Sequence, residues 1–313
     1  MKKVFIDGKE GTTGLQIVER LEKRNDIELL FLPEEERKDI NARRRMINKA
    51  DIVFLCLPDA AAKEAVSLCE NPETVIIDAS TAHRTDENFT YGFPELSENA
   101  FAAVKNAKRI ANPGCHASGF ISLIAPLTAA GILKKDTRLS CHSLTGYSGG
   151  GKKMIAQYES IDKANALFAP RQYGLAQLHK HLPEMQKVCG LVKSPAFSPI
   201  VDDFYSGMLV TVPVFAEDLI PGKTISDIKD CYRPLYTGPI VSFNENGDKI
   251  INGGFISANA LSGKDSMQIL VSGNEDRILL ISLFDNLGKG ASGAAVENMN
   301  ITMGLAPETG LNL

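Results

Sequence analysis

Val4-Phe5-Ile6-Asp7-Gly8-Lys9-Glu10-Gly11-Thr12-Thr13-Gly14 is an apolar run followed by a glycine-rich turn, after which Leu15, Val18 and Leu21 recur at helical spacing. Strand, glycine turn and helix form the context that a dinucleotide-binding fingerprint requires. The spacing is G-x-x-G-x-x-G rather than G-x-G-x-x-G, but either lets the backbone approach a pyrophosphate at the helix amino end. The alternative is a tight turn without ligand. We predict cofactor contacts at Gly8, Gly11, Thr12, Thr13 and Gly14.

Strands and helices continue to alternate after this turn. Apolar strands are expected at 27–32, 51–58 and 74–78, with a helix at 60–68. Continuous apolar strands are typical of a parallel sheet buried on both faces, so we predict a Rossmann-type, doubly wound α/β domain to about residue 114. Ligands bind beyond the carboxyl ends of such strands. Pro58 and Ser80 fall there and are further cofactor candidates.

The residues after the second strand bear on the choice between NAD and NADP. Glu34-Glu35-Glu36 is followed by Arg37 and Lys38, so both signs of charge are present. Arg37, Lys38 and Arg43 could pair with a 2′-phosphate, but such runs are more often a solvated helix face. These residues alone leave NAD and NADP both open.

Arg109-Ile110-Ala111-Asn112-Pro113-Gly114-Cys115 joins a short apolar strand to a helical pattern over 120–130. Asn-Pro-Gly is turn chemistry, so Cys115 is expected between a strand's carboxyl end and a helix's amino end. Free N–H groups and the helix dipole stabilise an anion there, which would favour a thiolate nucleophile. The alternative is a small buried residue at a tight turn.

The second half of the chain has a different character. A strand at 137–144 leads into a glycine-rich loop, where Ser148, Gly149 and Lys152 could bind an anionic ligand. His179 and His181 would point the same way if extended, and one of them is a candidate acid–base group. No third residue has a convincing metal-ligand spacing. Later strands, at 208–214, 240–244, 254–260, 267–271 and 278–284, predict an α+β domain with a mixed or antiparallel sheet.

The composition is that of an ordinary globular protein. The 313 residues carry a net charge of −4, which gives no reason to expect nucleic acid or an anionic membrane as partner. No apolar run reaches the roughly 18 residues of a membrane helix, and the first residues lack a signal-peptide core, so we expect a cytoplasmic protein. The six cysteines are scattered without a C-x-x-C pair, which predicts neither a zinc site nor disulfides.

Several motifs in combination resemble the N-acetyl-γ-glutamyl-phosphate reductase family, in its shorter type. They occur in the family's order and span nearly the whole chain. The cysteine motif, the His-x-His-x-Pro-Glu motif and the last motif are specific in combination, whereas the glycine motif alone is not. The motifs are Gly8-x-x-Gly11-x-x-Gly14, Tyr91-Gly92-Phe93-Pro94-Glu95-Leu96, Asn112-Pro113-Gly114-Cys115, Ser148-Gly149-Gly150-Gly151-Lys152, His179-x-His181-x-Pro183-Glu184 and Asp285-Asn286-Leu287-x-Lys289-Gly290-Ala291.

The resemblance implies NADPH-dependent reduction of N-acetylglutamyl 5-phosphate to the 5-semialdehyde in arginine biosynthesis, with release of phosphate. It implies Cys115 as nucleophile and a catalytic histidine within His179-x-His181, where we favour His179 and place His181 nearer the substrate. Asn286 would reach the nicotinamide, and Ser148, Gly149, Lys152 and Glu184 would line the substrate site. Many relatives carry Arg where this chain has Lys152, and lysine cannot make the same bidentate contact.

The resemblance also implies a domain organisation and a homodimer or homotetramer. The last helix would return to the first domain, giving an NADP-binding domain at 1–114 plus 286–313 and a catalytic and oligomerisation domain at 115–285. Two related activities stay open, those of aspartate-semialdehyde dehydrogenase and of an aminoadipyl-phosphate reductase. The Asn-Cys-Thr setting usual in the former is absent here. A non-enzymatic NADPH-binding scaffold is the third alternative.

Overall fold

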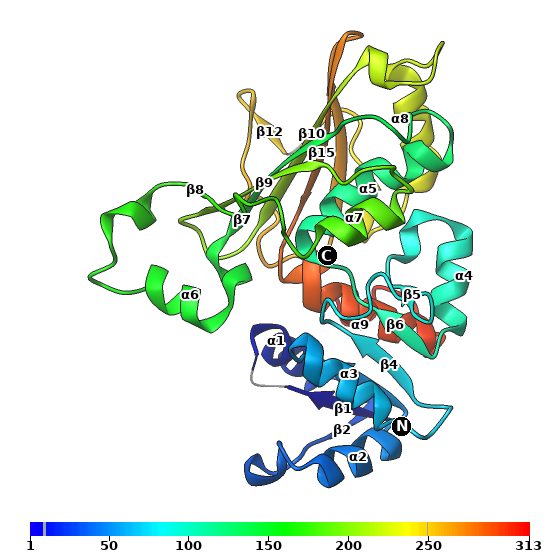
Figure 1. Cartoon of the computed structure of the whole chain (residues 1–313), viewed down its shortest axis with the longest axis vertical. Coiled ribbons are helices and arrows are strands. Elements are labelled where there is room, and N and C mark those ends of the chain that lie inside the picture. Colours follow the sequence, from blue (N-terminus) through cyan, green and yellow to red (C-terminus); the bar gives the residue numbers. More distant parts are fainter. Residues whose placement is uncertain (9–10, 249) are drawn as a thin grey trace. The chain divides into compact units, whose positions relative to one another are not determined.

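The computed structural model describes residues 1–8, 11–248 and 250–313, and its contacts divide the chain into two units. Unit 1 comprises Met1–Pro113 and Ala291–Leu311, and unit 2 comprises Gly114–Gly290 with Asn312–Leu313. In Figure 1 unit 1 contains the blue and cyan elements together with the red helix α9 (Gly293–Thr302). The chain therefore leaves unit 1 just before Cys115 and returns to it for its last helix.

Unit 1 is built on a six-stranded, wholly parallel sheet in the order β2-β1-β3-β4-β6-β5. From β1 the chain goes to β2 on one side and then to β3 on the other, which makes the β1–β3 edge a topological switch point. This arrangement confirms the predicted doubly wound domain. The strands are β1 (Lys2–Asp7), β2 (Ile27–Leu30), β3 (Ile52–Leu55), β4 (Val75–Asp78), β5 (Thr90–Tyr91) and β6 (Arg109–Ala111).

Helices cover both faces of this sheet because successive strand side chains point to opposite sides. Val4 and Ile6 join a core with apolar residues of α1, α4 and α9, whereas Phe5 joins a second core with residues of α2 and α3. The last helix of the chain thus completes the core of unit 1. The helices are α1 (Thr12–Leu21), α2 (Ile40–Lys49), α3 (Asp59–Ser67), α4 (Glu98–Asn106) and α9.

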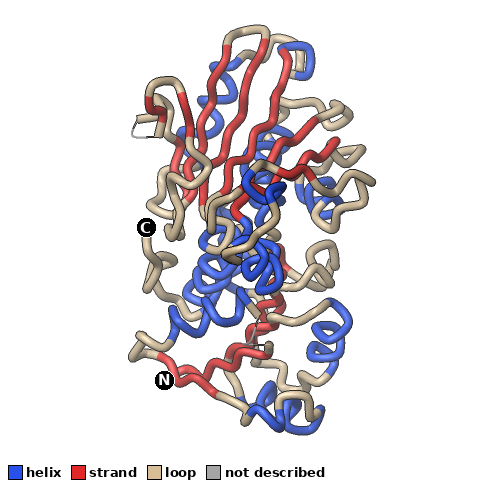
Figure 2. Tube along the Cα trace, turned by 90° about the vertical axis from the view of Figure 1, so that its left-hand side faces the viewer, coloured by secondary structure: helices blue, strands red, loops and turns tan. Residues whose placement is uncertain are grey.

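Unit 2 contains a seven-stranded mixed sheet in the order β11-β14-β15-β10-β7-β9-β8. Its central strands are antiparallel, whereas β7–β9 and β11–β14 are parallel pairs. Figure 2 shows these strands in red in the upper part of the view. They are β7 (Ser140–Gly146), β8 (Arg171–Gln172), β9 (Ala196–Asp202), β10 (Met208–Phe215), β11 (Val241–Phe243), β14 (Met267–Gly273) and β15 (Arg277–Phe284).

The buried helix α5 (Cys115–Ala129) packs on this sheet. A Cβ at Gly119 would lie 2.4 Å from Val210 Cγ2 and 2.9 Å from Ser282 Oγ, so only glycine allows this close approach. Ser282 Oγ also donates to the Gly119 carbonyl, at 3.3 Å. These contacts fix the depth of α5, and hence the position of Cys115 at its start. The other helices of unit 2 are α6 (Gly151–Tyr158), α7 (Leu182–Val188) and α8 (Ile225–Leu235).

Two of the predicted strands are displaced or shortened. The strand expected at 137–144 is β7, at 140–146. The strand expected at 254–260 is largely wrong: only Phe255–Ile256 (β13) is extended, in a hairpin with Ile251–Asn252 (β12). Gly253 and Gly254 both have positive φ and form the turn of this hairpin. The residues after Ile256 are mainly turns.

Candidate functional site

The glycine-rich turn of unit 1 brings the backbone of β1 against that of β3. Gly8 has φ +88°, and a Cβ there would lie 2.4 Å from the Cys56 carbonyl oxygen. Gly11 caps α1 without a side-chain hydrogen bond, so the first N–H groups of the helix face outward from the turn. Lys9 and Glu10 lie outside the described residues. This is the backbone geometry that lets a phosphate approach a helix amino end.

The other cofactor residues predicted in unit 1 lie at the same edge of the sheet, whereas Asn286 belongs to unit 2. Thr12 and Thr13 open α1, Gly14 is buried in its first turn, and Pro58 caps α3 after β3. Ser80 follows β4; its Oγ donates to Asp78 Oδ2 at 2.7 Å and accepts from Ala82 N at 3.1 Å. The backbone thus places all of them beyond the carboxyl ends of parallel strands, where ligands of this fold bind.

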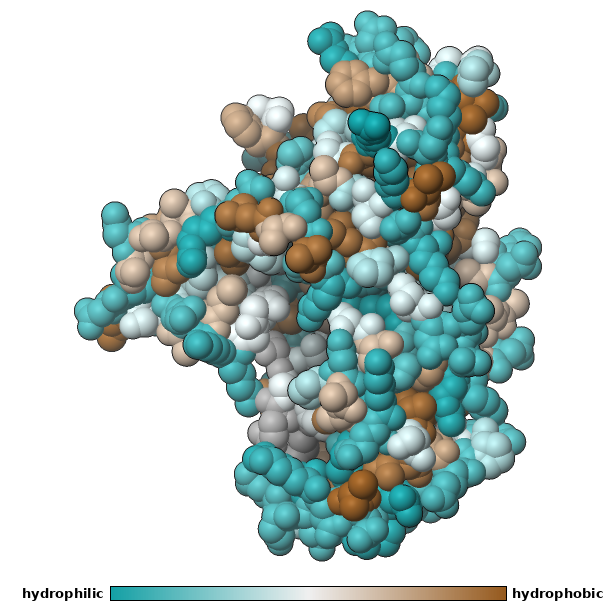
Figure 3. All heavy atoms as spheres, viewed as in Figure 1, coloured by the Kyte–Doolittle hydropathy of each residue, from teal (hydrophilic) through white to brown (hydrophobic). Residues whose placement is uncertain are grey.

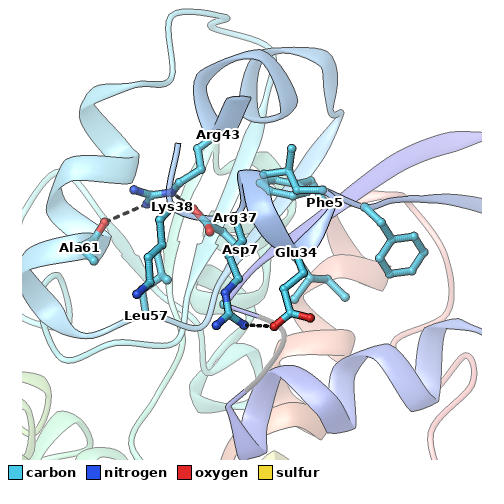
Figure 4. Close-up of a pocket in the computed structure, with 12 residues that line it drawn as sticks. Phe5, Asp7, Glu34, Arg37, Lys38, Arg43, Leu57 and Ala61 are labelled. Atoms are coloured by element: carbon cyan, nitrogen blue, oxygen red, sulfur yellow. Dashed lines mark hydrogen bonds and ion pairs between the residues drawn. The ribbon is translucent and has the colours of Figure 1, made fainter. Parts of the chain in front are cut away.

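A cavity of about 410 Å³ opens at this edge, within the size range of small-ligand pockets. Figure 4 shows charged side chains gathered around it: Arg37 lies beside Glu34, and Lys38 projects between Arg43 and Leu57. The cavity therefore combines apolar walls with three cationic side chains, Arg37, Lys38 and Arg43. It is lined by Phe5, Ile6, Asp7, Gly8, Phe31, Leu32, Glu34, Arg37, Lys38, Arg43, Leu57 and Ala61.

The cations of this cavity differ in their availability to a ligand. Arg43 is 6% exposed; its Nε donates to Asp7 Oδ2 at 3.0 Å and its Nη1 to Glu64 Oε2 at 2.6 Å. Burial raises the pKa of Asp7, and Arg43 partly offsets that shift. Arg37 Nη1 lies 3.4 Å from Glu34 Oε1, a long ion pair, and its side chain is about half exposed. Arg37 and Lys38, rather than Arg43, are the cations that can meet an added phosphate.

In unit 2, Cys115 begins α5 directly after the Asn-Pro-Gly turn, as predicted. Gly114 caps the helix without a side-chain bond, so the N–H groups of the first turn and the positive end of the helix dipole lie at the cysteine. Glu184, which is 1% exposed, accepts a 3.2 Å hydrogen bond from Gly114 N. A residue of α7 thereby holds the turn that carries the thiol.

His179 and His181 lie together beside this helix. Their ring centroids are 4.8 Å apart, and each lies within 5.7 Å of the His116 ring. Burial, and then Lys180, lowers the pKa of His179. His181 is 5% exposed, with Nε2 4.0 Å from Glu184 Oε1. The structure therefore brings both predicted histidines into one cluster.

An extended segment was expected to point His179 and His181 the same way, and this expectation is wrong because the segment is a turn. Lys180 and His181 form a turn, and His181 has φ −85° and ψ −13° at the start of α7. His181 N donates to His179 Nδ1 at 3.3 Å, so the turn itself draws the two residues together. A preceding residue, Gln177, has φ +55°, and its side-chain amide pairs with both Phe197 N and Phe197 O at 2.8 and 2.7 Å.

Three residues of this cluster were not among the predicted site residues. His116 Nδ1 lies 2.6 Å from Ser143 Oγ, and His116 Nε2 lies 2.7 Å from the Tyr173 hydroxyl. Burial, followed by His179 and Lys180, lowers the pKa of His116 to about 3, so its ring is neutral. The position of His116 directly after Cys115 was the one local signal that could have suggested a role for it. Its partners Ser143 and Tyr173 lie 27 and 57 positions away, so no local pattern connects them.

The predicted substrate loop is a short 3-10 turn (Tyr147–Gly150) followed by α6. Ser148 is buried, and the Asn286 amide donates to its Oγ at 3.0 Å while accepting from Gly207 N at 2.9 Å. Gly149 lies against the same amide. Asn286 thus holds this turn in place, and its contact with a nicotinamide stays a prediction. Lys152 lies on α6 with an exposed side chain.

Four of the other five cysteines have raised pKa values. Burial raises the pKa of Cys56 to about 12, and raises those of Cys141, Cys189 and Cys231. A raised pKa suppresses the thiolate, which is the reactive form. Over the parts of the chain that the structure describes, no group of three or more His, Cys, Asp or Glu side chains is arranged to hold a metal ion.

Two family models match the chain. The semialdehyde dehydrogenase NAD-binding domain matches residues 3–104, and the semialdehyde dehydrogenase dimerisation domain matches residues 115–286. The class of protein that the fold and site define is therefore a semialdehyde dehydrogenase-type oxidoreductase. None of the helices described is long and apolar enough to cross a membrane.

Curated relatives define the family more closely. A protein of Trichormus variabilis called N-acetyl-gamma-glutamyl-phosphate reductase is 42% identical, with 99% of each chain aligned. Proteins of the same name from Sinorhizobium fredii and Brucella ovis are 44% identical over 96% of this chain and 98% and 99% of theirs. The chain belongs to the N-acetyl-γ-glutamyl-phosphate reductase family.

Solved structures with the same fold are more distant in sequence. Aspartate semialdehyde dehydrogenase II of Vibrio cholerae, solved with ASA, has a TM-score of 0.72 and 18% identity over 97% of this chain and 98% of its own. The enzyme of Candida albicans, solved with NADP, has a TM-score of 0.65 and 14% identity over 97% and 98%. At these identities the likeness concerns the fold alone.

Proposed function

We propose that the protein catalyses NADPH-dependent reduction of N-acetyl-L-glutamyl 5-phosphate to N-acetyl-L-glutamate 5-semialdehyde, with release of phosphate, in arginine biosynthesis. Family membership supports the reaction. The observation that carries the chemistry is a cysteine at the amino end of a buried helix, where the next residue, His116, packs against a pair of histidines. That arrangement suits acyl transfer through a thioester.

The residues of unit 1 fit NADPH, and we assign cofactor binding to this unit. The backbone at Gly8 and Gly11 offers helix-end N–H groups for the pyrophosphate. Arg37 and Lys38 would hold the 2′-phosphate, because Arg43 is already neutralised by Asp7 and Glu64. When bound, NADPH supplies the hydride that reduces the thioester to the aldehyde level.

Unit 2 carries the covalent steps in this proposal. The Cys115 thiolate attacks the acyl carbon, the C–O bond to phosphate breaks, and phosphate leaves with the bonding electrons. The thioester carbonyl oxygen gathers negative charge as it is attacked, and N–H groups of the first turn of α5 stabilise that charge. After reduction, the thiohemiacetal loses its hydroxyl proton and expels the Cys115 thiolate as the aldehyde forms.

The histidine pair provides the acid and base. His181 Nε2 lies 4.0 Å from Oε1 of the buried Glu184 side chain, so a negative charge on Glu184 would stabilise a proton that His181 takes up. The lowered pKa of His179 keeps that ring neutral at pH 7. We therefore propose that His181 accepts the proton of Cys115 and that His179 contacts the substrate. The sequence had favoured the opposite, with His179 catalytic and His181 nearer the substrate. Ser148, Gly149 and Lys152 stay candidates for the substrate's anionic groups.

We further propose that unit 2 mediates homo-oligomerisation, as a dimer or tetramer. The family model that matches this region is named a dimerisation domain. In Figure 1, α6 and β8 lie on an extension to the left of the sheet, and Figure 3 shows apolar residues exposed over it. A second copy covering this extension would bury its exposed apolar side chains, which are Ile161, Phe168, Leu175 and Leu178.

All six cysteines are free thiols, and the proposed nucleophile must stay reduced to react. We therefore place the protein in the cytoplasm.

The reverse reaction tests the proposed function, because acyl phosphates are unstable. Protein, NADP and phosphate are mixed with N-acetylglutamate 5-semialdehyde or, in parallel, with aspartate semialdehyde, and NADPH absorbance is followed. A phosphate-dependent rise with the first aldehyde alone is expected. A rise with only the second would assign the protein to the aspartate-semialdehyde dehydrogenase reaction, and no rise with either, despite NADPH binding, would favour the scaffold alternative.

A further inference from the structure

Three side chains form a continuous hydrogen-bonded chain beside the candidate nucleophile. Ser143 on β7 contacts His116 Nδ1 at 2.6 Å, and His116 Nε2 contacts the Tyr173 hydroxyl at 2.7 Å. Ser143 is fully buried, His116 is 3% exposed, and Tyr173 is half-buried. His116 directly follows Cys115, and the charge of Cys115 acts on Tyr173 at one end of this chain, so the chain lies beside the proposed nucleophile.

Counting protons gives the direction of both hydrogen bonds. The neutral His116 ring carries one proton, so one nitrogen donates and the other accepts. Within the described residues, Ser143 Oγ bonds only to His116 Nδ1, and buried donors are almost always satisfied. Ser143 therefore donates to Nδ1. The ring proton then resides on Nε2, which donates to the Tyr173 oxygen.

This direction has a consequence for Tyr173. Its oxygen accepts from His116, so its own O–H is available to donate to another group. The Tyr173 ring lies 5.9 Å from that of His179. Burial, and then the charge of a Cys115 thiolate, raises the pKa of Tyr173, so the phenol stays protonated and lies within electrostatic range of the sulfur.

The backbone around Tyr173 is held on the strand that pairs with β7. Tyr173 N donates to the Pro199 carbonyl at 3.0 Å, and Pro199 on β9 is the register partner of Ser143 on β7. The Gln177 amide binds Phe197 of β9 through both of its polar atoms. Both ends of the Ser143–His116–Tyr173 chain are thus attached to adjacent strands of one sheet.

We propose that Ser143 and His116 are positioning residues that orient the Tyr173 hydroxyl as a hydrogen-bond donor, first to the Cys115 thiolate and then to the substrate oxygen bound there. The proposal deepens the function given above and rests on it only for the identity of that oxygen. The directions of the hydrogen bonds are independent of the substrate.

The first test is the tautomer of His116 in the whole protein. Nitrogen-15 labelled histidine shows by NMR which ring nitrogen carries the proton, and loss of one signal set in His116→Gln assigns it among the five histidines. A proton on Nε2 at neutral pH is expected. A proton on Nδ1 would mean that Tyr173 donates to His116, and it would overturn the proposal.

The second test uses variants and two readouts. Tyr173→Phe should raise the pKa of Cys115, measured from the pH dependence of its alkylation, and lower kcat by about 10²-fold with little change in the KM for NADPH. His116→Gln keeps an N–H toward Tyr173 and should retain most activity, whereas the shorter His116→Asn should not. Combining His116→Asn with Tyr173→Phe should lower kcat no further than Tyr173→Phe alone.

An alkylation profile and a kcat for Tyr173→Phe that match the wild type would refute the inference. If the wild type lacks the proposed activity, the NMR and alkylation results still test the orientation of the Tyr173 hydroxyl. The two failures are therefore distinguishable, and circular dichroism of each variant confirms that it is folded.

Discussion

The Glu184 carboxylate accepts a 3.2 Å hydrogen bond from the backbone N–H of Gly114, a residue 70 positions earlier in the chain. Its other oxygen lies 4.0 Å from His181 Nε2. One buried carboxylate therefore contacts both the turn that carries Cys115 and one of the two histidines. This shared partner fixes the nucleophile and its acid–base neighbour relative to each other.

Substitutions of Glu184 separate these two contacts. Glu184→Gln keeps an oxygen for Gly114 N but removes the charge beside His181, so we expect kcat to fall by about 10²-fold with a normal fold. Glu184→Ala also leaves Gly114 N without its acceptor and should lower the free energy of unfolding by about 1–3 kcal/mol. Steady-state kinetics and urea denaturation measure the two effects. Equal kcat in wild type and Glu184→Gln would exclude a role for the charge.

Arg37 is expected to determine the preference for NADPH over NADH. Because its guanidinium would meet the 2′-phosphate, Arg37→Ala should raise the KM for NADPH about tenfold and leave that for NADH nearly unchanged. Lys105→Ala, an exposed lysine of α4 away from the cavity, is the matched control. A similar rise in KM for both cofactors would argue against this contact.

Cys115 should be the most reactive of the six thiols. Burial raises the pKa values of Cys56, Cys141, Cys189 and Cys231, whereas Cys115 lies at a helix amino end. Iodoacetamide at pH 7 followed by peptide mass spectrometry should label Cys115 first, in parallel with loss of activity. Cys69, which is similarly half-buried, is the internal comparison. Uniform labelling of the two would contradict thiolate stabilisation at Cys115.

His116 should make the protein less stable as pH falls. Its pKa is about 3 when folded against an ordinary value of 6.5, so between these values the unfolded chain binds the extra proton and stability falls with decreasing pH. The slope is about 1.4 kcal/mol per pH unit below pH 6. His116→Gln removes this contribution. Urea denaturation from pH 7.5 to 5 should show a shallower decline for the variant, and parallel curves would mean that the pKa of His116 is the same in the folded and unfolded states.

The sequence predicted those parts of the molecule that local signals encode. Apolar runs, glycine turns and helical spacing placed β1 to β4 and the start of α5 within a few residues, because each signal lies within the element that it forms. β9 gave no such signal: Pro199 lies within it, and proline normally argues against a strand. Its pairing with β7 and β8 depends on distant segments.

The site residues also fall into those with a local sequence signal and those that only long-range contacts bring together. Cys115 was recognisable because turn and helix signals flank it, and the glycines near β1 because their spacing is local. The contacts of His116 with Ser143 and Tyr173 cross 27 and 57 positions, and no spacing rule connects them. The approach of His179 to His181 depends on a turn that their sequence did not indicate.

The most direct test of the account is to isolate its covalent intermediate. Protein is mixed with N-acetylglutamate 5-semialdehyde and NADP in the absence of phosphate, and the products are followed by absorbance and by peptide mass spectrometry. We predict a burst of about one NADPH per chain and an N-acetylglutamyl group on the peptide that contains Cys115, released as acyl phosphate when phosphate is added. Multiple turnovers with phosphate but no acyl group on Cys115, or an acyl group on another residue, would contradict the account.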